Sequence, residues 1–204
     1  MATRPGTPRK STAAARGRQT PQKRSLPLGR IILGVIVLAA IAGGLLYWLN
    51  QPARVPAAAQ SPGQPVPTLP TRQHVEGAVQ YSTNPPTSGD HAASAATWGI
   101  YNSTPPADER LVHNLEHGGV IISYNPSKID AATVEQLKTL TRDLRRERVC
   151  LILTPRDSIQ DDKSIALTAW GVLGMLDGYD EAAIRAFWRD HVARGPEFGE
   201  GQCG

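Results

Sequence analysis

The pattern of apolar and polar positions divides the chain into a polar start, one long apolar run and a region of short alternating elements. Residues 1–30 contain almost no large apolar side chains and are rich in Arg, Lys, Thr, Pro, Ala and Gly. Such a segment cannot bury enough apolar surface to offset the entropy cost of ordering it, so we predict a disordered basic tail. Residues 31–49 then form an uncharged and mostly apolar run.

The apolar run 31–49 is long enough to cross a membrane as a helix. At 1.5 Å per residue it measures about 28 Å, close to the roughly 30 Å of a bilayer's hydrocarbon core. Basic residues precede it and Tyr47 and Trp48 end it, so the positive-inside rule places the N-terminus in the cytoplasm. We predict a single-pass protein of the cytoplasmic (inner) membrane with an extracytoplasmic C-terminal domain. A cleaved signal peptide is the alternative, but its apolar core is usually shorter, about 7–15 residues.

Two further features accompany this run. Small residues recur four positions apart within it, at Ala39 and Gly43 and at Ala40 and Gly44, and this spacing predicts a weak homodimer through the helix. Residues 50–73 contain six of the 17 prolines and no acidic residue. This composition predicts a semi-rigid linker that holds the following domain away from the membrane.

From residue 74 to residue 204 the pattern is that of one folded domain. Short apolar runs bounded by Gly, Pro and polar residues predict strands, whereas apolar positions three and four apart predict helices. The predicted strands are 97–101, 120–124, 149–154 and 165–170, with some strand character at 74–81, and the predicted helices are 131–146, capped by Asp130, and a last one from Asp180 to near Gly195. The sequence therefore predicts an α+β fold, with a small mixed sheet and two packed helices.

The formal charge of +4 hides two opposite regions. Residues 1–73 hold ten of the 22 Lys and Arg and no acid, whereas residues 74–204 hold the other twelve and all 18 acids, a net −6. The folded part is thus acidic and lacks a basic face with interleaved aromatic residues, so we predict that it binds no nucleic acid.

Candidate chemistry centres on Val112-His-Asn-Leu-Glu-His-Gly-Gly119. His113 and His117 share one face of a helical turn, with Cβ atoms about 5–6 Å apart, and could bind one ion; in a strand they would lie about 13 Å apart. Four of the five histidines fall between residues 74 and 117. We therefore predict a Zn(II) or Cu(II) site of His91, His113 and His117, completed by His74 or Glu116.

Two other interpretations of this segment stay open. The histidines could be structural, in a metal-free envelope domain that binds another protein or a cell-wall component. The spelling His113-x-x-Glu116-His117 also fits inverted zinc peptidases. However, such enzymes need a longer helix and a larger domain. A metalloenzyme with Glu116 as base is therefore the interpretation that the sequence favours least, and the sequence leans against enzymatic activity without deciding it.

The two cysteines admit three states. Outside the cytoplasm Cys150 and Cys203 can form a disulfide that joins the C-terminal tail to the sheet. The alternatives are a buried free Cys150 with a disordered Cys203, or thiolate ligation of a metal.

Four blocks of the sequence resemble a known bacterial family, the one catalogued as domain of unknown function 3105. They are Asn84-Pro-Pro-Thr-Ser-Gly-Asp-His91, Trp98-Gly-Ile-Tyr101, the Val112–Gly119 block and Ala166-Leu-Thr-Ala-Trp-Gly171. The resemblance covers residues 74–197. It implies a membrane-anchored or secreted envelope protein and adds Tyr81 and Asn114 to the expected site residues, as supporting groups or alternative ligands, but it implies no activity.

Overall fold

The structure, a computed structural model, describes residues 28–49, 59–199, 201 and 203. The chain separates into two units, residues 1–54 and 55–204, and each is described by itself. Most of the basic tail predicted at 1–30 and the first part of the linker predicted at 50–73 lie outside the described residues.

The first unit contains the helix α1, Leu28–Leu49, which includes the whole apolar run. Its described large apolar side chains are exposed, from 48% at Val37 to 68% at Leu38. Within the described residues, no helix qualifies as long and apolar enough to cross a membrane. The helix at 31–49 is therefore present, whereas the membrane-spanning role predicted for it is not supported.

The second unit is built on a six-stranded mixed sheet, as the sequence predicts in kind. Its central strands pair in the order β5-β3-β4, with β3 and β4 parallel and β3 and β5 antiparallel. The strands are β1 (Gln64–Pro65), β2 (Gly99–Ile100), β3 (Val120–Tyr124), β4 (Leu151–Pro155), β5 (Ile165–Ala169) and β6 (Val172–Leu176), in the spatial order β1-β6-β5-β3-β4-β2.

Two of these strands differ from the sequence prediction. β6 pairs with β5 through a tight turn at Gly171, where φ is +65°. β1 comes from the predicted linker and pairs with β6, so the second half of 50–73 is part of the fold rather than a free spacer. Gly63 permits this approach, because a Cβ there would come within 3.0 Å of Val172, Phe187 and His191. Conversely, the strand character at 74–81 amounts only to an isolated bridge between His74 and His91.

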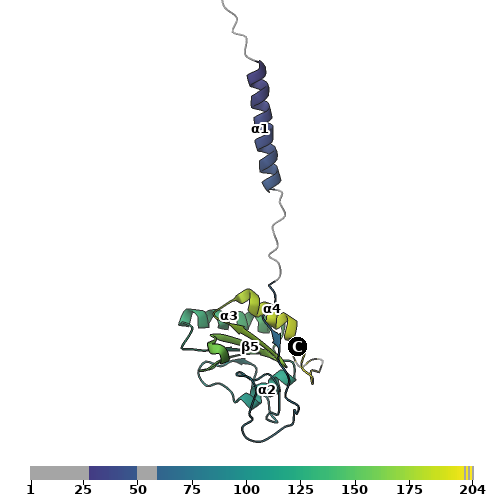
Figure 1. Ribbon diagram of the computed structural model, residues 1–204, viewed down its shortest axis with the longest axis vertical. Coiled ribbons are helices and arrows are strands. Elements are labelled where there is room, and N and C mark those ends of the chain that lie inside the picture. Colours follow the sequence, from purple (N-terminus) through teal and green to yellow (C-terminus); the bar gives the residue numbers. More distant parts are fainter. Residues whose placement is uncertain (1–27, 50–58, 200, 202, 204) are drawn as a thin grey trace, which may run out of the picture. The chain divides into compact units, whose positions relative to one another are not determined.

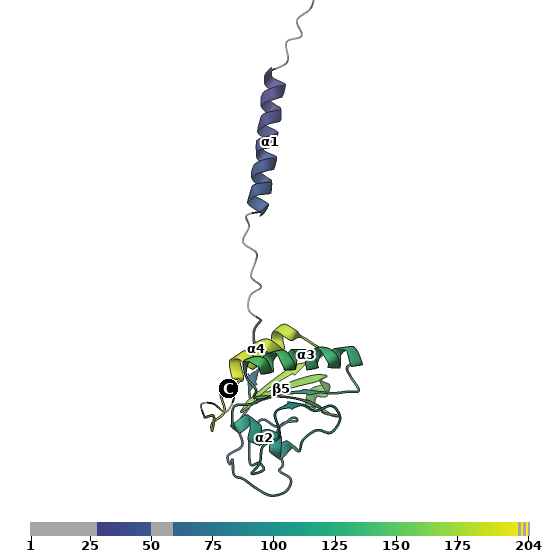
Figure 2. The same cartoon turned by 180° about the vertical axis from the view of Figure 1, so that it is seen from behind.

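Three helices flank the sheet, one more than predicted. Figure 1 shows α3 (Ala131–Glu147) and α4 (Glu181–His191) together on one face and α2 (Asp108–Glu116) on the other, and Figure 2 shows the same division from behind. The predicted N-cap Asp130 is present and accepts from Thr133 N at 2.8 Å. Asp180, where the last helix was predicted to begin, is also a cap and accepts from Ala183 N at 3.0 Å. The extra helix is α2, which carries the paired histidines.

Strand residues alternate between the two faces, as a two-residue side-chain period requires. Ile122 and Leu153 join the large core under α3 and α4, whereas Ile121 and Ile152 join a smaller cluster with Leu115 of α2. The α2 face is therefore where the loops and the histidines lie against the sheet.

Candidate metal centre

The histidine pair lies at the end of α2, in the helical conformation that lets both rings meet. His113 is in the last turn and His117 is the C-cap, and their ring centroids are 4.8 Å apart. Their Nε2 atoms are 3.0 Å apart. Gly118, at φ +81°, then turns the chain into β3. The two glycines also permit close packing, since a Cβ on Gly119 would come within 2.5 Å of the Trp98 ring.

His91 is held by the shaped loop that precedes it. Gly89 has a φ of +122°, and the Leu69 side chain lies against its Cα. The backbone of His91 donates to Gln73 O at 3.0 Å and accepts from Val75 N at 2.8 Å. This parallel bridge sets His74 directly beside His91, and both imidazoles lie next to α2.

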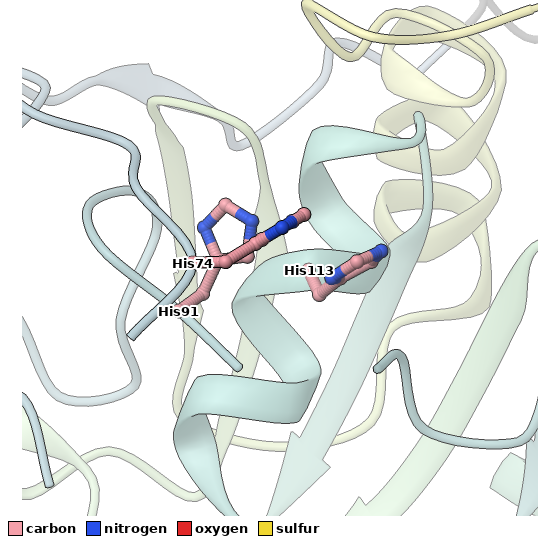
Figure 3. A group of neighbouring side chains, drawn as sticks. All are labelled: His74, His91 and His113. Atoms are coloured by element: carbon pink, nitrogen blue, oxygen red, sulfur yellow. The ribbon is translucent and has the colours of Figure 1, made fainter. Parts of the chain in front are cut away.

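Three histidines form one group of potential ligands. One ring nitrogen from each of His74, His91 and His113 lies within 4.8 Å of the others. The rings of His74 and His113 make an interplanar angle of 7°. Figure 3 shows them almost parallel, with the ring of His91 turned across them. All three centroid separations are 5.1–5.2 Å. The predicted ligands were His91, His113 and His117, with His74 or Glu116 as the fourth. In the structure His74 is a member of the group, and His117 contacts it only by its Nε2 atom, which faces Nε2 of His113.

Backbone carbonyls fix which nitrogen of each ring carries the proton. Nδ1 of His91 lies 2.9 Å from Gly89 O, and Nδ1 of His113 lies 2.7 Å from Ala92 O. Nδ1 of His117 lies 3.2 Å from Glu197 O. A carbonyl oxygen only accepts, so each Nδ1 donates and each neutral ring has its lone pair on Nε2. Metal-ligating histidines are typically oriented in this way.

The Nε2 lone pairs face other acceptors. Nε2 of His113 faces Nε2 of His117, and neither has a hydrogen to share when both rings are neutral. Nε2 of His91 is completely buried and lies 2.9 Å from Oε2 of Glu116, without a hydrogen bond of good geometry. Burial is the main cause that lowers the pKa of His113, so a proton is disfavoured there. A positive ion among these atoms would relieve both contacts.

Two charged residues that the sequence did not suggest complete the surroundings. Arg72 Nη1 lies 3.3 Å from Oε1 of Glu116 and 3.2 Å from Oε1 of Glu197. Glu197 comes from the C-terminal tail, whose backbone pairs with Glu116 O at 3.0 Å. Each of these contacts spans at least 44 residues, and no local pattern announces them.

The tail is fixed by a disulfide between Cys150 and Cys203, 53 residues apart. Neither cysteine is free, so thiolate ligation and a free Cys150 do not hold in the structure. The bond joins the first residue before β4 to the tail, and Cys203 O accepts from Val149 N at 3.2 Å. The segment that supplies Glu197 is thereby tied to the sheet.

Asn114 and Tyr81 support the site from a distance. The Asn114 amide accepts from Ala96 N at 2.8 Å and donates to Ala96 O at 3.0 Å, so both of its polar atoms are engaged. Tyr81 donates its hydroxyl to Asp90 O at 2.8 Å, and burial, followed by nearby carboxylates, raises its pKa. Asn114 holds the loop whose carbonyl orients His113, and Tyr81 holds the residue before His91.

Comparison with known families identifies one match. The sequence pattern of the family described as "Protein of unknown function (DUF3105)" covers residues 74–204. The chain belongs to this family. The match begins at His74 and includes all four clustered histidines, Glu116 and Glu197. Neither the curated proteins nor the solved structures contain a match. Family membership assigns no activity, so function has to be argued from the site itself.

Proposed function

We propose that this member of the family is a metal-binding protein of the cell envelope, which takes one Zn(II) or Cu(II) ion through His74, His91 and His113. The observation that carries the proposal is the orientation of the rings. Their Nδ1 atoms are committed to backbone carbonyls at His91 and His113, and the lone pairs of Nε2 turn toward other acceptors rather than toward donors.

The distances suit a borderline transition metal after a small closure of the rings. Ligand nitrogens about 2.0–2.1 Å from a tetrahedral ion are roughly 3.3 Å from each other. The three nitrogens here lie within 4.8 Å, and the His113–His117 pair is already at 3.0 Å. Imidazole ligands suit Zn(II), Cu(II) and other late first-row metals. Glu116, 1% exposed, supplies a negative charge that offsets part of the ion's charge.

Binding or delivery of the ion fits the site better than catalysis. His91 is fully buried and His113 is 8% exposed, whereas His74 is exposed and forms the outer wall of the group. An ion can therefore enter and leave past one exposed ligand. The unidentified partner would be an envelope protein that supplies or receives the metal.

The anchoring part of the proposal rests on the sequence. Attachment to the cytoplasmic membrane with the domain outside is favoured by the uncharged run 31–49 and by the basic residues before it. The resemblance to the family implies the same envelope location. The small-residue spacing in α1 favours a weak homodimer there. Metal binding by the second unit does not depend on either point.

Titration of the full chain with Zn(II) tests the metal site. We expect one tightly bound equivalent in the wild type and at least a tenfold loss of affinity in His74→Gln. His74 is exposed, so this variant should leave the free energy of unfolding unchanged without metal. His191→Gln is the matched control, because His191 lies apart on α4, 4.6 Å from the ring of Phe187.

Stability measurements give an independent readout. Metal that binds only the folded chain should raise the free energy of unfolding by about 2.7 kcal/mol at a free concentration of 100 Kd. This increase should disappear in His113→Gln and persist in His191→Gln. If no metal binds at micromolar concentrations and the free energy of unfolding is the same with and without metal, the protein is a metal-free interaction domain with structural histidines.

A further inference from the structure

A second group of potential ligands adjoins the first. One oxygen of Glu116, one nitrogen of His117 and one oxygen of Glu197 lie within 4.8 Å of one another. They come from the last residue of α2, its C-cap and the C-terminal tail. Glu116 is buried, His117 is partly buried and Glu197 is exposed. This group therefore leads from the buried histidines outward to the surface.

Glu116 is a member of the second group and also adjoins the first, because its two oxygens face different neighbours. Oε2 lies 2.9 Å from Nε2 of His91, and Oε1 lies 3.3 Å from Nη1 of Arg72. The Nε2 atom of His91 is fully buried, has no hydrogen-bond partner and is directed at this carboxylate. A carboxylate with one oxygen toward each of two adjoining groups is suited to bridge two cations, which in two-metal sites lie about 3.5–4 Å apart.

Arg72 carries a positive charge at the second group. A single nitrogen, Nη1, contacts both Glu116 and Glu197, at 3.3 and 3.2 Å. The Arg72 side chain is 47% exposed, so it can turn into solvent, and an incoming cation would replace its charge beside the buried Glu116. The pair with Glu197, in which both side chains are 47% exposed, contributes little stability, typically below about 1 kcal/mol. A divalent cation that also gains an imidazole ligand should compete well for this place.

We propose that Glu116, His117 and Glu197 bind a second divalent cation such as Zn(II), which shares Glu116 with the first ion and displaces Arg72. The inference rests on the proposed function only in one point, that Glu116 is shared with a first ion. His117 contributes Nε2, since its Nδ1 donates to Glu197 O. The second position is more exposed than the first and offers fewer imidazoles. It is therefore the weaker position.

Zn(II) titration of the full chain with two charge-removing variants tests this. We expect two equivalents in the wild type, the second at least tenfold weaker than the first. Glu197→Gln should keep the first equivalent and lose the second, because an amide oxygen is a poorer ligand than a carboxylate. Arg72→Gln should strengthen the second about tenfold, since it removes the competing cation, and Arg72→Gln/Glu197→Gln should lose it again.

Matched controls lie on α3, on the face of the sheet opposite to α2. Glu135→Gln and Arg146→Gln make the same charge changes in the exposed pairs with Lys138 and Asp143, and both should titrate as the wild type. One equivalent in the wild type and in Arg72→Gln alike, retained in Glu197→Gln and weakened in His74→Gln, would overturn the inference and leave the proposed function standing. One equivalent in Arg72→Gln that survives in His74→Gln/Arg72→Gln and is lost in Arg72→Gln/Glu197→Gln would support the inference and overturn the proposed function.

Discussion

The two faces of the sheet are built by different physics. Under α3 and α4 the buried side chains are almost all apolar, among them Leu137, Leu144 and Phe187 at no more than 1% exposed. Beside α2 the buried set includes His91, Asn114 and Glu116, all at 1% or less. Burial stabilises the first set directly, whereas each member of the second must be matched with a partner or cost free energy.

The difference indicates which face of the sheet carries the functional site. On the α2 side, backbone carbonyls orient the rings of His91, His113 and His117. A disulfide fixes the tail. Even so, Nε2 of His91 is left without a hydrogen-bond partner. Real proteins depart from full polar satisfaction mainly at functional sites. The apolar face should therefore determine stability, and the α2 face should determine binding.

The largest expected effect comes from opening the apolar face. Phe187→Ala should lower the free energy of unfolding by about 3–5 kcal/mol, because Phe187 is fully buried and packs closely on Gly174. Zn(II) affinity of the folded molecules should not change. Urea unfolding and Zn(II) titration measure the two quantities separately.

Phe187→Leu is the matched control, since it keeps most of the apolar volume and should cost less. A loss of Zn(II) affinity in Phe187→Ala with little loss of stability would reverse the assignment of the two faces.

The apolar face is also the part of the fold that the sequence predicts well. β3, β4 and β5 are contiguous apolar runs, and α3 and α4 begin at aspartate caps, so local pattern and tertiary burial agree. β6 was not predicted because Gly174 interrupts its apolar run. β1 was not predicted because a two-residue strand in a proline-rich segment has no periodicity. α2 starts with Asp108-Glu109-Arg110 and has few apolar positions, so the loops that surround it define it more than its own pattern does.

The candidate site was predictable only in part, for a related reason. The His113/His117 spacing and the loop before His91 are local signals, and they located three of the histidines. The placement of His74 depends on a backbone bridge to residue 91, and the parts of Arg72 and Glu197 depend on the path of the linker and the tail. Contacts between such distant segments leave no pattern in a single sequence.

An intermediate effect is expected at the residue that joins stability to the site. Asn114→Ala should cost about 2–4 kcal/mol, because Ala96 N and Ala96 O, now bonded to the amide, would lose their partners in a buried place. Zn(II) affinity should also fall, since the loop from Ala92 to Ala96 carries the carbonyl that orients His113.

Asn114→Asp tests the same contact with almost no change in the shape of the side chain. It retains the acceptor for Ala96 N but opposes a carboxylate to Ala96 O, so it should destabilise the domain as well. If either variant loses stability with unchanged Zn(II) affinity, the loop does not orient His113, and Asn114 belongs functionally with the apolar face.

The smallest change in stability, and the sharpest separation of the two faces, is expected for Glu116→Gln. The amide keeps the shape of the side chain and can donate to Nε2 of His91, and Arg72 keeps its contact with Glu197. Loss of a buried charge should therefore leave the free energy of unfolding without metal unchanged or raise it by up to about 1 kcal/mol. Zn(II) affinity should fall about 10- to 100-fold, as for changes in groups that support a metal ligand.

Glu135→Gln, the same change at an exposed position of α3, should alter neither quantity. A loss of about 3–5 kcal/mol in Glu116→Gln would instead be the result of breaking a structural buried ion pair. In that case the polar face, like the apolar one, would exist for stability.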